Sequence, residues 1–257
     1  MTHTAPPAAT AAFGPRAAVA VGHALVLSPV TPRWDEGAFF TPVIEALTGN
    51  GLRVTVVDTL SLWDEEVDSM AAFTARWREL LPHFGPVDLL CGNALGGAVA
   101  QALLPGVDPA TAVLLVSGPS RTDALLEARL GEIADLATAG RPGEALTLLN
   151  RRVLPHGAVA AQESVPPADA DASAGRRLAA GMRLLCGIDL SPQVLAHPGP
   201  LLHIVGSDSQ LVARRHTATA AHHDVQVVAG SGMRPHFENT AHVSGLIDAF
   251  LRQKGLQ

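Results

Sequence analysis

Short apolar runs alternate along this chain with segments of helical periodicity, and this alternation restricts the possible folds more than any other feature. Parallel strands need long crossover connections, usually helices, and strands that are apolar throughout are buried on both faces of a sheet. The sequence therefore predicts an α/β fold, a mostly parallel sheet with helices on both faces. The expected strands are residues 17–21, 23–27, 52–58, 88–92, 112–117, 201–206 and 224–228, and the expected helices include 38–48, 70–81, 95–104 and 241–253.

The strand signal disappears in the middle of the chain, where three helical patterns follow one another at 123–139, 143–154 and 172–186. A helical block inserted into a β/α series is expected to lie as a lid over one end of the sheet. The N-terminus is rich in Ala, Pro and Thr, which favours disorder. The expected units are a disordered segment at 1–15, a core at 16–118 and 200–257, and a helical lid at 119–199.

Composition argues against several classes of partner. The chain has 257 residues, 47% hydrophobic and 16% charged, with a net charge of −6 and basic residues clustered no further than pairs. No large basic field is present, so a nucleic-acid partner is not expected. No apolar stretch reaches about 18 residues and no export signal is visible, which predicts a cytoplasmic protein without a membrane partner. The two cysteines, Cys91 and Cys186, are expected to be reduced thiols.

A tight turn joins the predicted strand at 88–92 to the helix that follows. The turn reads Gly92-Asn93-Ala94-Leu95-Gly96-Gly97, which matches the nucleophile-elbow pattern G-x-S-x-G with Ala94 in place of serine. Glycines two residues either side of the centre let strand and helix approach closely around a strained central residue. A phosphate-binding turn is the alternative, but the spacing is not G-x-G-x-x-G and no P-loop lysine follows.

On this elbow and the surrounding β/α series, the chain resembles the α/β-hydrolase superfamily from about residue 17 to residue 251. The resemblance implies an oxyanion hole made of two main-chain amides, those of Val30 and Leu95. In this family the first amide usually follows a His-Gly pair, whereas Ser28-Pro29 stands here. Because both donors are backbone groups, they can survive the loss of the nucleophile.

The same resemblance places the other two catalytic positions. The family's acid usually follows the penultimate strand at a spacing that selects Ser209, with Asp208 one residue early. Its histidine belongs to a stretch resembling G-H-x-P-H-x-E, which aligns with Gly232 to Glu238. Met233 then occupies the catalytic position and His236 the second, non-catalytic one.

These substitutions remove ordinary serine-hydrolase chemistry. A methyl group and a thioether can neither attack a carbonyl nor carry a proton. If a proton carrier is needed, His236 or Asp208 is the candidate, although His236 can equally be structural and Asp208 a turn cap. Asn93 is a candidate ligand contact or a turn residue, and Trp34 is expected to line the pocket or the core. His222 and His223 would point apart on a strand, so no metal site and no cofactor are predicted.

Three functions remain open. The first is a repurposed, non-hydrolytic enzyme of cyclase, lyase or isomerase type that acts on a hydrophobic carbonyl compound, which the resemblance associates with bacterial natural-product biosynthesis. The second is a non-catalytic small-molecule-binding pseudo-hydrolase. The third is a serine hydrolase inactivated by an engineered Ser-to-Ala change at Ala94, which would leave Met233 and Ser209 unexplained.

Overall fold

The computed structural model describes residues 8–17, 19–158 and 170–256. Within them, seven strands form one sheet in the order β1-β3-β2-β4-β5-β6-β7, parallel except for β1, which pairs antiparallel with β3. This confirms the predicted α/β class with a mostly parallel sheet. The strands are β1 (Thr10–Phe13), β2 (Gly22–Leu27), β3 (Leu52–Val57), β4 (Leu89–Asn93), β5 (Ala112–Val116), β6 (Leu201–Gly206) and β7 (Asp224–Val228).

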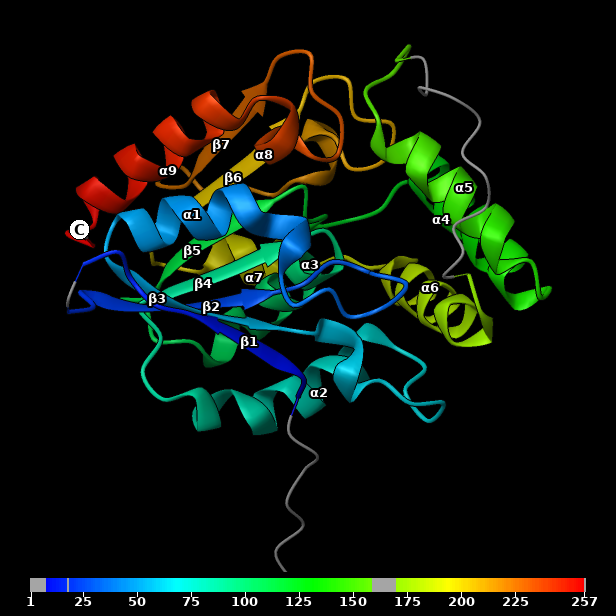
Figure 1. Ribbon diagram of the computed structural model, residues 1–257, viewed down its shortest axis with the longest axis horizontal. Helices are drawn as coiled ribbons and strands as arrows, with labels where there is room; N and C mark the ends of the chain where they lie inside the picture. The colour runs from blue at the N-terminus through cyan, green and yellow to red at the C-terminus, as the bar shows by residue number, and fades with distance from the viewer. Residues whose placement is uncertain (1–7, 18, 159–169, 257) are drawn as a thin grey trace, which may run out of the picture.

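Helices cover both faces of the sheet (Figure 1). α1 (Thr41–Gly49) and α9 (Thr240–Gln253) pack together on one face, next to the short α8 (Pro235–Glu238). α2 (Met70–Leu80), α3 (Leu95–Leu103) and α7 (Ser191–Ala196) pack on the other face. Short 3-10 turns lie at Ala38–Phe40, Thr59–Leu62, Leu81–Phe84, Leu104–Gly106 and Arg214–His216.

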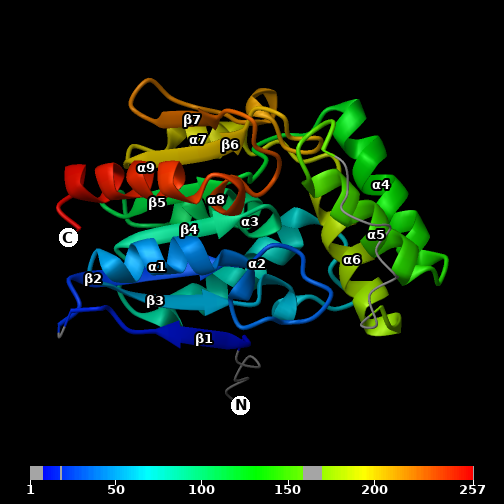
Figure 2. The ribbon, with the colours of Figure 1, turned by 45° about the horizontal axis from the view of Figure 1, so that its top comes forward.

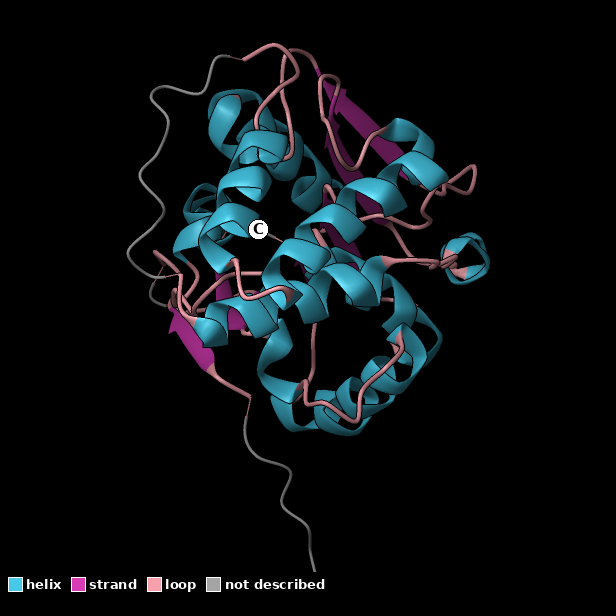
Figure 3. Cartoon of the chain, turned by 90° about the vertical axis from the view of Figure 1, so that its right-hand side faces the viewer, coloured by secondary structure: helices cyan, strands magenta, loops and turns pink. Residues whose placement is uncertain are grey.

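Three helices of the 119–199 segment stand apart from these two layers, and we call them the helical insertion: α4 (Ala124–Thr138), α5 (Pro142–Val153) and α6 (Ala172–Leu185). They pack on one another beyond the carboxyl ends of the parallel strands (Figure 2). Viewed from that side, helices lie in front of much of the sheet (Figure 3). The side chains of Asp123 and Asp171 accept hydrogen bonds from the amides of Leu126 and Ala174 and so begin α4 and α6.

The N-terminal region departs from the sequence prediction. Residues 8–15, expected to be disordered, include the edge strand β1, whose backbone pairs with Val54 to Val57. Residues 1–7 of the same segment lie outside the described residues. The strand expected at 17–21 is absent from its described residues, where the Val19 side chain is 77% exposed. Within the described part of the chain, no helix combines the length and hydrophobicity that crossing a bilayer requires.

Candidate functional site

The turn between β4 and α3 has the geometry of the predicted elbow. Ala94 has φ 47° and ψ −111°, a conformation that is strained for a residue with a Cβ atom. Its amide donates to the carbonyl of Val116 at 3.1 Å, which ties the turn to the neighbouring strand β5. A Cβ atom at Gly92 would overlap the carbonyl oxygen of Gly96, and one at Gly96 would overlap that of Leu27. Only glycine therefore permits this approach of strand and helix.

The Ala94 methyl group borders a cavity of about 320 Å³ between the strand ends and the helical insertion, which we call the elbow cavity. Among the described residues, the insertion contributes apolar side chains and the polar Asn150, whereas the core contributes both polar and apolar residues. The lining residues that the argument uses are Val30, Thr31, Asn93, Ala94, Leu95, Met233, Arg234 and His236 from the core, and Leu126, Leu130, Leu146, Leu149, Val153, Met182 and Leu185 from the insertion.

Two main-chain amides at this cavity have no acceptor among the described residues. Leu95 is the first residue of α3, so its amide lacks an intrahelical partner, and neither it nor the Val30 amide has another hydrogen bond there. Both residues line the cavity beside Ala94. Aligned donors at a helix N-terminus stabilise developing negative charge on oxygen. The two amides predicted from the resemblance thus share one cavity wall.

Met233 lies on the same wall. It lies in the loop after β7 and is 6% exposed, and its sulfur accepts a hydrogen bond from the Val212 amide at 3.3 Å. The Met233 amide donates to the carbonyl of Val153 at the end of α5 at 3.0 Å. Met233 is therefore held in place by both the core and the insertion, and it presents no titratable group to the cavity.

His236 also lines the cavity but is deeply buried, at 1% exposure. Its Nε2 lies 3.1 Å from the carbonyl of Phe39, which can only accept, so Nε2 carries the proton and Nδ1 the lone pair. Burial lowers the pKa of His236 to about 4, so the ring is neutral at neutral pH. Nδ1 is buried and has no partner among the described residues.

The two residues at the acid position lie away from the cavity lining. Asp208 is exposed, and its carboxylate accepts a hydrogen bond from the neighbouring Ser207 hydroxyl at 2.9 Å. The Ser209 hydroxyl accepts from the Leu211 amide at 3.3 Å. Neither residue lines the elbow cavity. Of the two predicted proton carriers, the structure thus brings only His236 to the same cavity as Ala94.

The remaining predicted residues take different places. Asn93 lines the elbow cavity, and its side-chain amide donates to the Val116 carbonyl at 2.9 Å. Trp34 is part of the packing against the α1 and α9 layer and does not line the cavity. His222 and His223 do not lie on a strand and do not point apart, which corrects that expectation. They lie in the turn before β7 with ring centroids 4.2 Å apart.

Sequence reasoning missed three polar residues of the cavity lining, Thr31, Asn150 and Arg234. Thr31 is 7% exposed, and its hydroxyl has no hydrogen-bond partner within the described ranges. Arg234 is exposed and is the one residue lining the cavity that is charged at neutral pH, because His236 is neutral. Arg234 stands at an unspecified position of the stretch aligned with Gly232 to Glu238, and the other two belong to no motif. Thr31 and Arg234 are adjacent in sequence to the predicted site residues Val30 and Met233, and that adjacency was the available signal.

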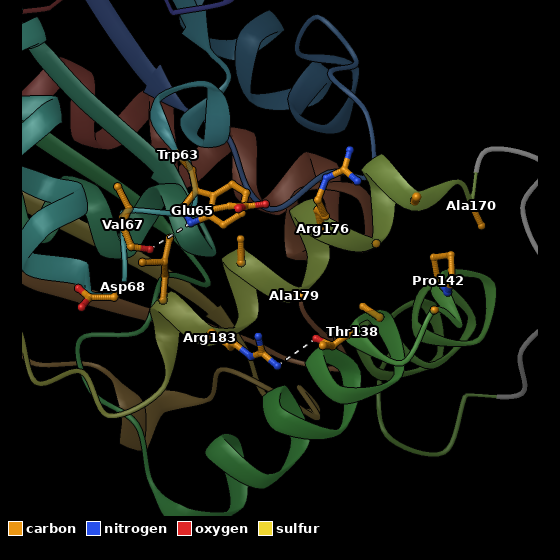
Figure 4. Close-up of a pocket in the computed structure, with 16 residues that line it drawn as sticks. Trp63, Glu65, Val67, Asp68, Thr138, Pro142, Ala170, Arg176, Ala179 and Arg183 are labelled. Carbon is orange, nitrogen blue, oxygen red and sulfur yellow. Dashed lines mark hydrogen bonds between the residues drawn. The ribbon is translucent and has the colours of Figure 1, made fainter.

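A second, more open cavity of about 890 Å³ lies on the opposite face of α6 (Figure 4). It is lined by Trp63 and neighbouring residues of the core and by Arg176, Ala179 and Arg183 of α6. None of the elbow residues lines it. The two unpartnered amides and the strained turn therefore single out the smaller cavity as the candidate site.

No family model matches this sequence, and no curated protein matches it in sequence. Solved structures do match it over nearly the whole chain. MGS-M2, an α/β-hydrolase enzyme from a Medee basin deep-sea metagenome library, superposes with a TM-score of 0.77 at 11% identity, covering 95% of this chain and 93% of its own. A bromoperoxidase from Bacillus anthracis gives 0.74 at 16% identity, with 95% and 94% covered. The chain has the α/β-hydrolase fold.

A third similar structure, MenH from S. aureus, has a TM-score of 0.67 at 14% identity and covers 96% of this chain and 98% of its own. The α/β-hydrolase fold thus spans the helical insertion as well as the sheet. At these identities the likeness establishes the fold and leaves the chemistry to be argued from the cavity.

Proposed function

We propose that this α/β-hydrolase-fold protein is a non-hydrolytic enzyme, of cyclase, lyase or isomerase type, that binds a hydrophobic carbonyl compound in the elbow cavity. The observation that carries the proposal is the pair of unpartnered amides, Val30 and Leu95, beside a methyl group in an apolar cavity. A carbonyl or enolate oxygen can accept both hydrogen bonds in a cavity whose lining is mostly apolar. Ala94 forms no bond to the substrate, so the reaction proceeds without an acyl-enzyme intermediate.

Hydrolysis by the usual route is not available to these residues. In serine hydrolases the loss of the triad costs about 10⁶ in kcat, while the oxyanion hole and binding retain about 10³ to 10⁴ over water. Ala94 and Met233 replace the nucleophile and the base with groups that cannot transfer a proton. We therefore place catalysis in charge stabilisation and in holding a flexible substrate folded.

We assign proton transfer to His236, because it borders the cavity and its Nδ1 has a free lone pair. A group whose pKa is about 4 is a weak base at neutral pH. The two amides must therefore supply most of the stabilisation, by lowering the energy of the enolate that forms when a proton leaves the carbon beside the carbonyl.

Acetophenone in heavy water tests this directly. If the cavity stabilises an enolate, the methyl protons of the ketone exchange with deuterium faster when protein is added, which proton NMR follows as loss of the methyl signal. His236→Asn should slow the added exchange at least about tenfold, because general base catalysis contributes about 10² to 10⁴. Asp208→Asn should leave it unchanged, since Asp208 is exposed and lies outside the cavity lining.

A second candidate is a non-catalytic binding protein that uses the same cavity. The 1% exposure of His236 favours it, because a base so enclosed has little access to a ligand. Binding of acetophenone without any faster deuterium exchange would support this function and contradict the enzyme.

A further inference from the structure

Arg234 gives the elbow cavity a charge asymmetry. Among the described residues that line the cavity, none is acidic and His236 is neutral, so Arg234 is the one that carries a net charge at neutral pH. The side chain is exposed although the residue lines the cavity, which places it where the cavity meets solvent. The guanidinium makes no hydrogen bond or close ion pair among the described residues, although its charge opposes the rise in the pKa of the nearby Glu238 that burial causes.

The charge of Arg234 is opposite in sign to that of the protein as a whole. The net charge of the chain is −6, which repels anions in general. Arg234 follows Met233 directly, and the Met233 backbone is fixed by its hydrogen bond to Val153. The guanidinium therefore extends from a fixed point on the wall, with its donors free. Arginine presents paired N–H groups that match a carboxylate in a bidentate arrangement.

We infer that the ligand of the elbow cavity is an amphipathic keto acid, whose carbonyl lies at the Val30 and Leu95 amides and whose carboxylate lies at Arg234. This inference rests on the proposed function for the carbonyl end and adds the anionic end. A cavity of about 320 Å³ holds the volume of roughly ten waters, which suits a ligand of roughly ten to fifteen non-hydrogen atoms. The apolar side chains of the helical insertion enclose the body between the two polar ends.

Geometry supports the separation of the two ends. Leu95 begins α3 at the end of β4, and Arg234 lies in the loop that follows β7, three strands away in the sheet order. Leu95 is fully buried, whereas Arg234 is exposed. A carbonyl at the buried amides and a carboxylate at the guanidinium thus belong to opposite ends of one molecule. The carboxylate keeps part of its hydration there, which avoids the large cost of burying a charge.

Four aryl probes separate the two ends in calorimetric titrations. They are para-acetylphenylacetate, its methyl ester, para-ethylphenylacetate and the methyl ester of the latter, so that ketone and carboxylate vary independently. We expect para-acetylphenylacetate to bind about tenfold more tightly than its methyl ester. The preference should decrease as salt is raised, because the Arg234 pair is partly exposed to solvent.

Arg234→Gln should abolish the preference for the carboxylate and leave the affinity for the methyl esters unchanged. Arg252→Gln, which removes an exposed arginine of α9 outside the cavity lining, is the matched control and should leave all four affinities unchanged. Equal affinities of acid and ester in the unaltered protein, or an equal loss for both in Arg234→Gln, would overturn the inference.

The ketone comparison tests the proposed function separately. If the carboxylate contributes through Arg234 but acetyl and ethyl probes bind alike, the anion site stands and the carbonyl site fails. If the acetyl group strengthens binding but the carboxylate does not, the carbonyl site stands and the anion site fails. Absence of binding by all four probes would overturn both.

Discussion

The two walls of the elbow cavity are built on different principles. On the core side, backbone packs against backbone: Gly97 lies so close to Gly118 that a Cβ atom at Gly97 would be 2.8 Å from the Gly118 Cα. On the insertion side, leucine, valine and methionine side chains face the cavity, and Gly131 of α4 has open space around it. The core wall holds the polar groups at fixed positions, whereas the insertion wall sets the shape of the space available to the ligand.

The largest expected effect is on stability, when a methyl group is added to a glycine on the core side and, for comparison, to one in the helical insertion. Gly96→Ala would drive a Cβ atom into the Leu27 backbone, which cannot move without shifting β2, so we expect a loss of about 4 kcal/mol or more in the free energy of unfolding. Gly131→Ala should instead gain about 0.5 to 1 kcal/mol, because alanine is the better helix former. Urea denaturation measures both. Similar effects of the two substitutions on the free energy of unfolding would contradict the proposed difference in packing between the core and the insertion.

Low pH should destabilise the core of the protein, because two buried histidines are held neutral there. Burial lowers the pKa of His203 on β6 to about 3 and that of His236 to about 4, from the ordinary value of 6.5. The unfolded chain therefore binds protons that the folded core does not, and stability present above pH 6.5 is lost as pH falls toward these values. Between pH 7 and pH 5 each histidine should cost about 2 kcal/mol.

His203→Leu isolates one of these contributions. The variant should lose less stability than the unaltered protein over the same pH interval, by about 2 kcal/mol in urea denaturation. An unchanged pH dependence in His203→Leu would show that this imidazole is not held neutral in the core, and it would contradict the lowered pKa of His203.

An effect of similar size is expected where the two walls join. Arg177 of α6 pairs with Asp58 at 2.7 Å, and its Nε donates to the Thr31 carbonyl at 3.0 Å, one residue from Val30. The Asp58 side chain is only 4% exposed, so Arg177→Met would leave a buried carboxylate unpaired. We expect a loss of about 2 to 3 kcal/mol in stability and weaker binding of acetophenone, because the loop that carries the Val30 amide is released.

The neighbouring Arg176 provides the matched control. It is exposed and faces the larger cavity, so Arg176→Met should change stability by less than about 0.5 kcal/mol and leave acetophenone binding unaltered. If Arg177→Met weakens stability but not binding, the insertion supports the fold without positioning the amide, and the two walls act independently.

The sequence predicted the elements whose signals are local. Helices α4 and α6 begin at aspartates that cap them, and β6 is apolar throughout and buried, so pattern and structure agree. Strand β1 was missed because its stability comes from pairing with β3, about forty residues away, and its own side chains are half exposed. Of the strand expected at 17–21, the described residues 17 and 19–21 form no strand, and the Val21 amide donates instead to the carbonyl of Gly51, just before β3, at 3.0 Å.

The candidate site was predictable where a motif fixes the backbone. Glycine spacing located Ala94, and the resemblance located Val30, Leu95 and Met233, all of which line one cavity. The acid position could not be placed in this way, because the spacing selects a loop after β6 in which both Asp208 and Ser209 lie outside the cavity lining. Arg234 escaped prediction because its adjacency to Met233 does not by itself show that its side chain borders an apolar cavity.

The smallest expected effect is that of restoring the nucleophile. Ala94→Ser places a hydroxyl on a backbone that already has the elbow conformation, with φ at 47°. A serine hydroxyl needs a base to accept its proton, but Met233 offers none, and His236 is a weak base because burial lowers its pKa to about 4. We therefore expect Ala94→Ser to hydrolyse para-nitrophenyl acetate no more than about twofold faster than the unaltered protein. The absorbance of nitrophenolate follows the reaction. A rise of about a hundredfold or more would show that an acid and a base lie within reach of residue 94, and that the core wall is that of a serine hydrolase lacking only its nucleophile.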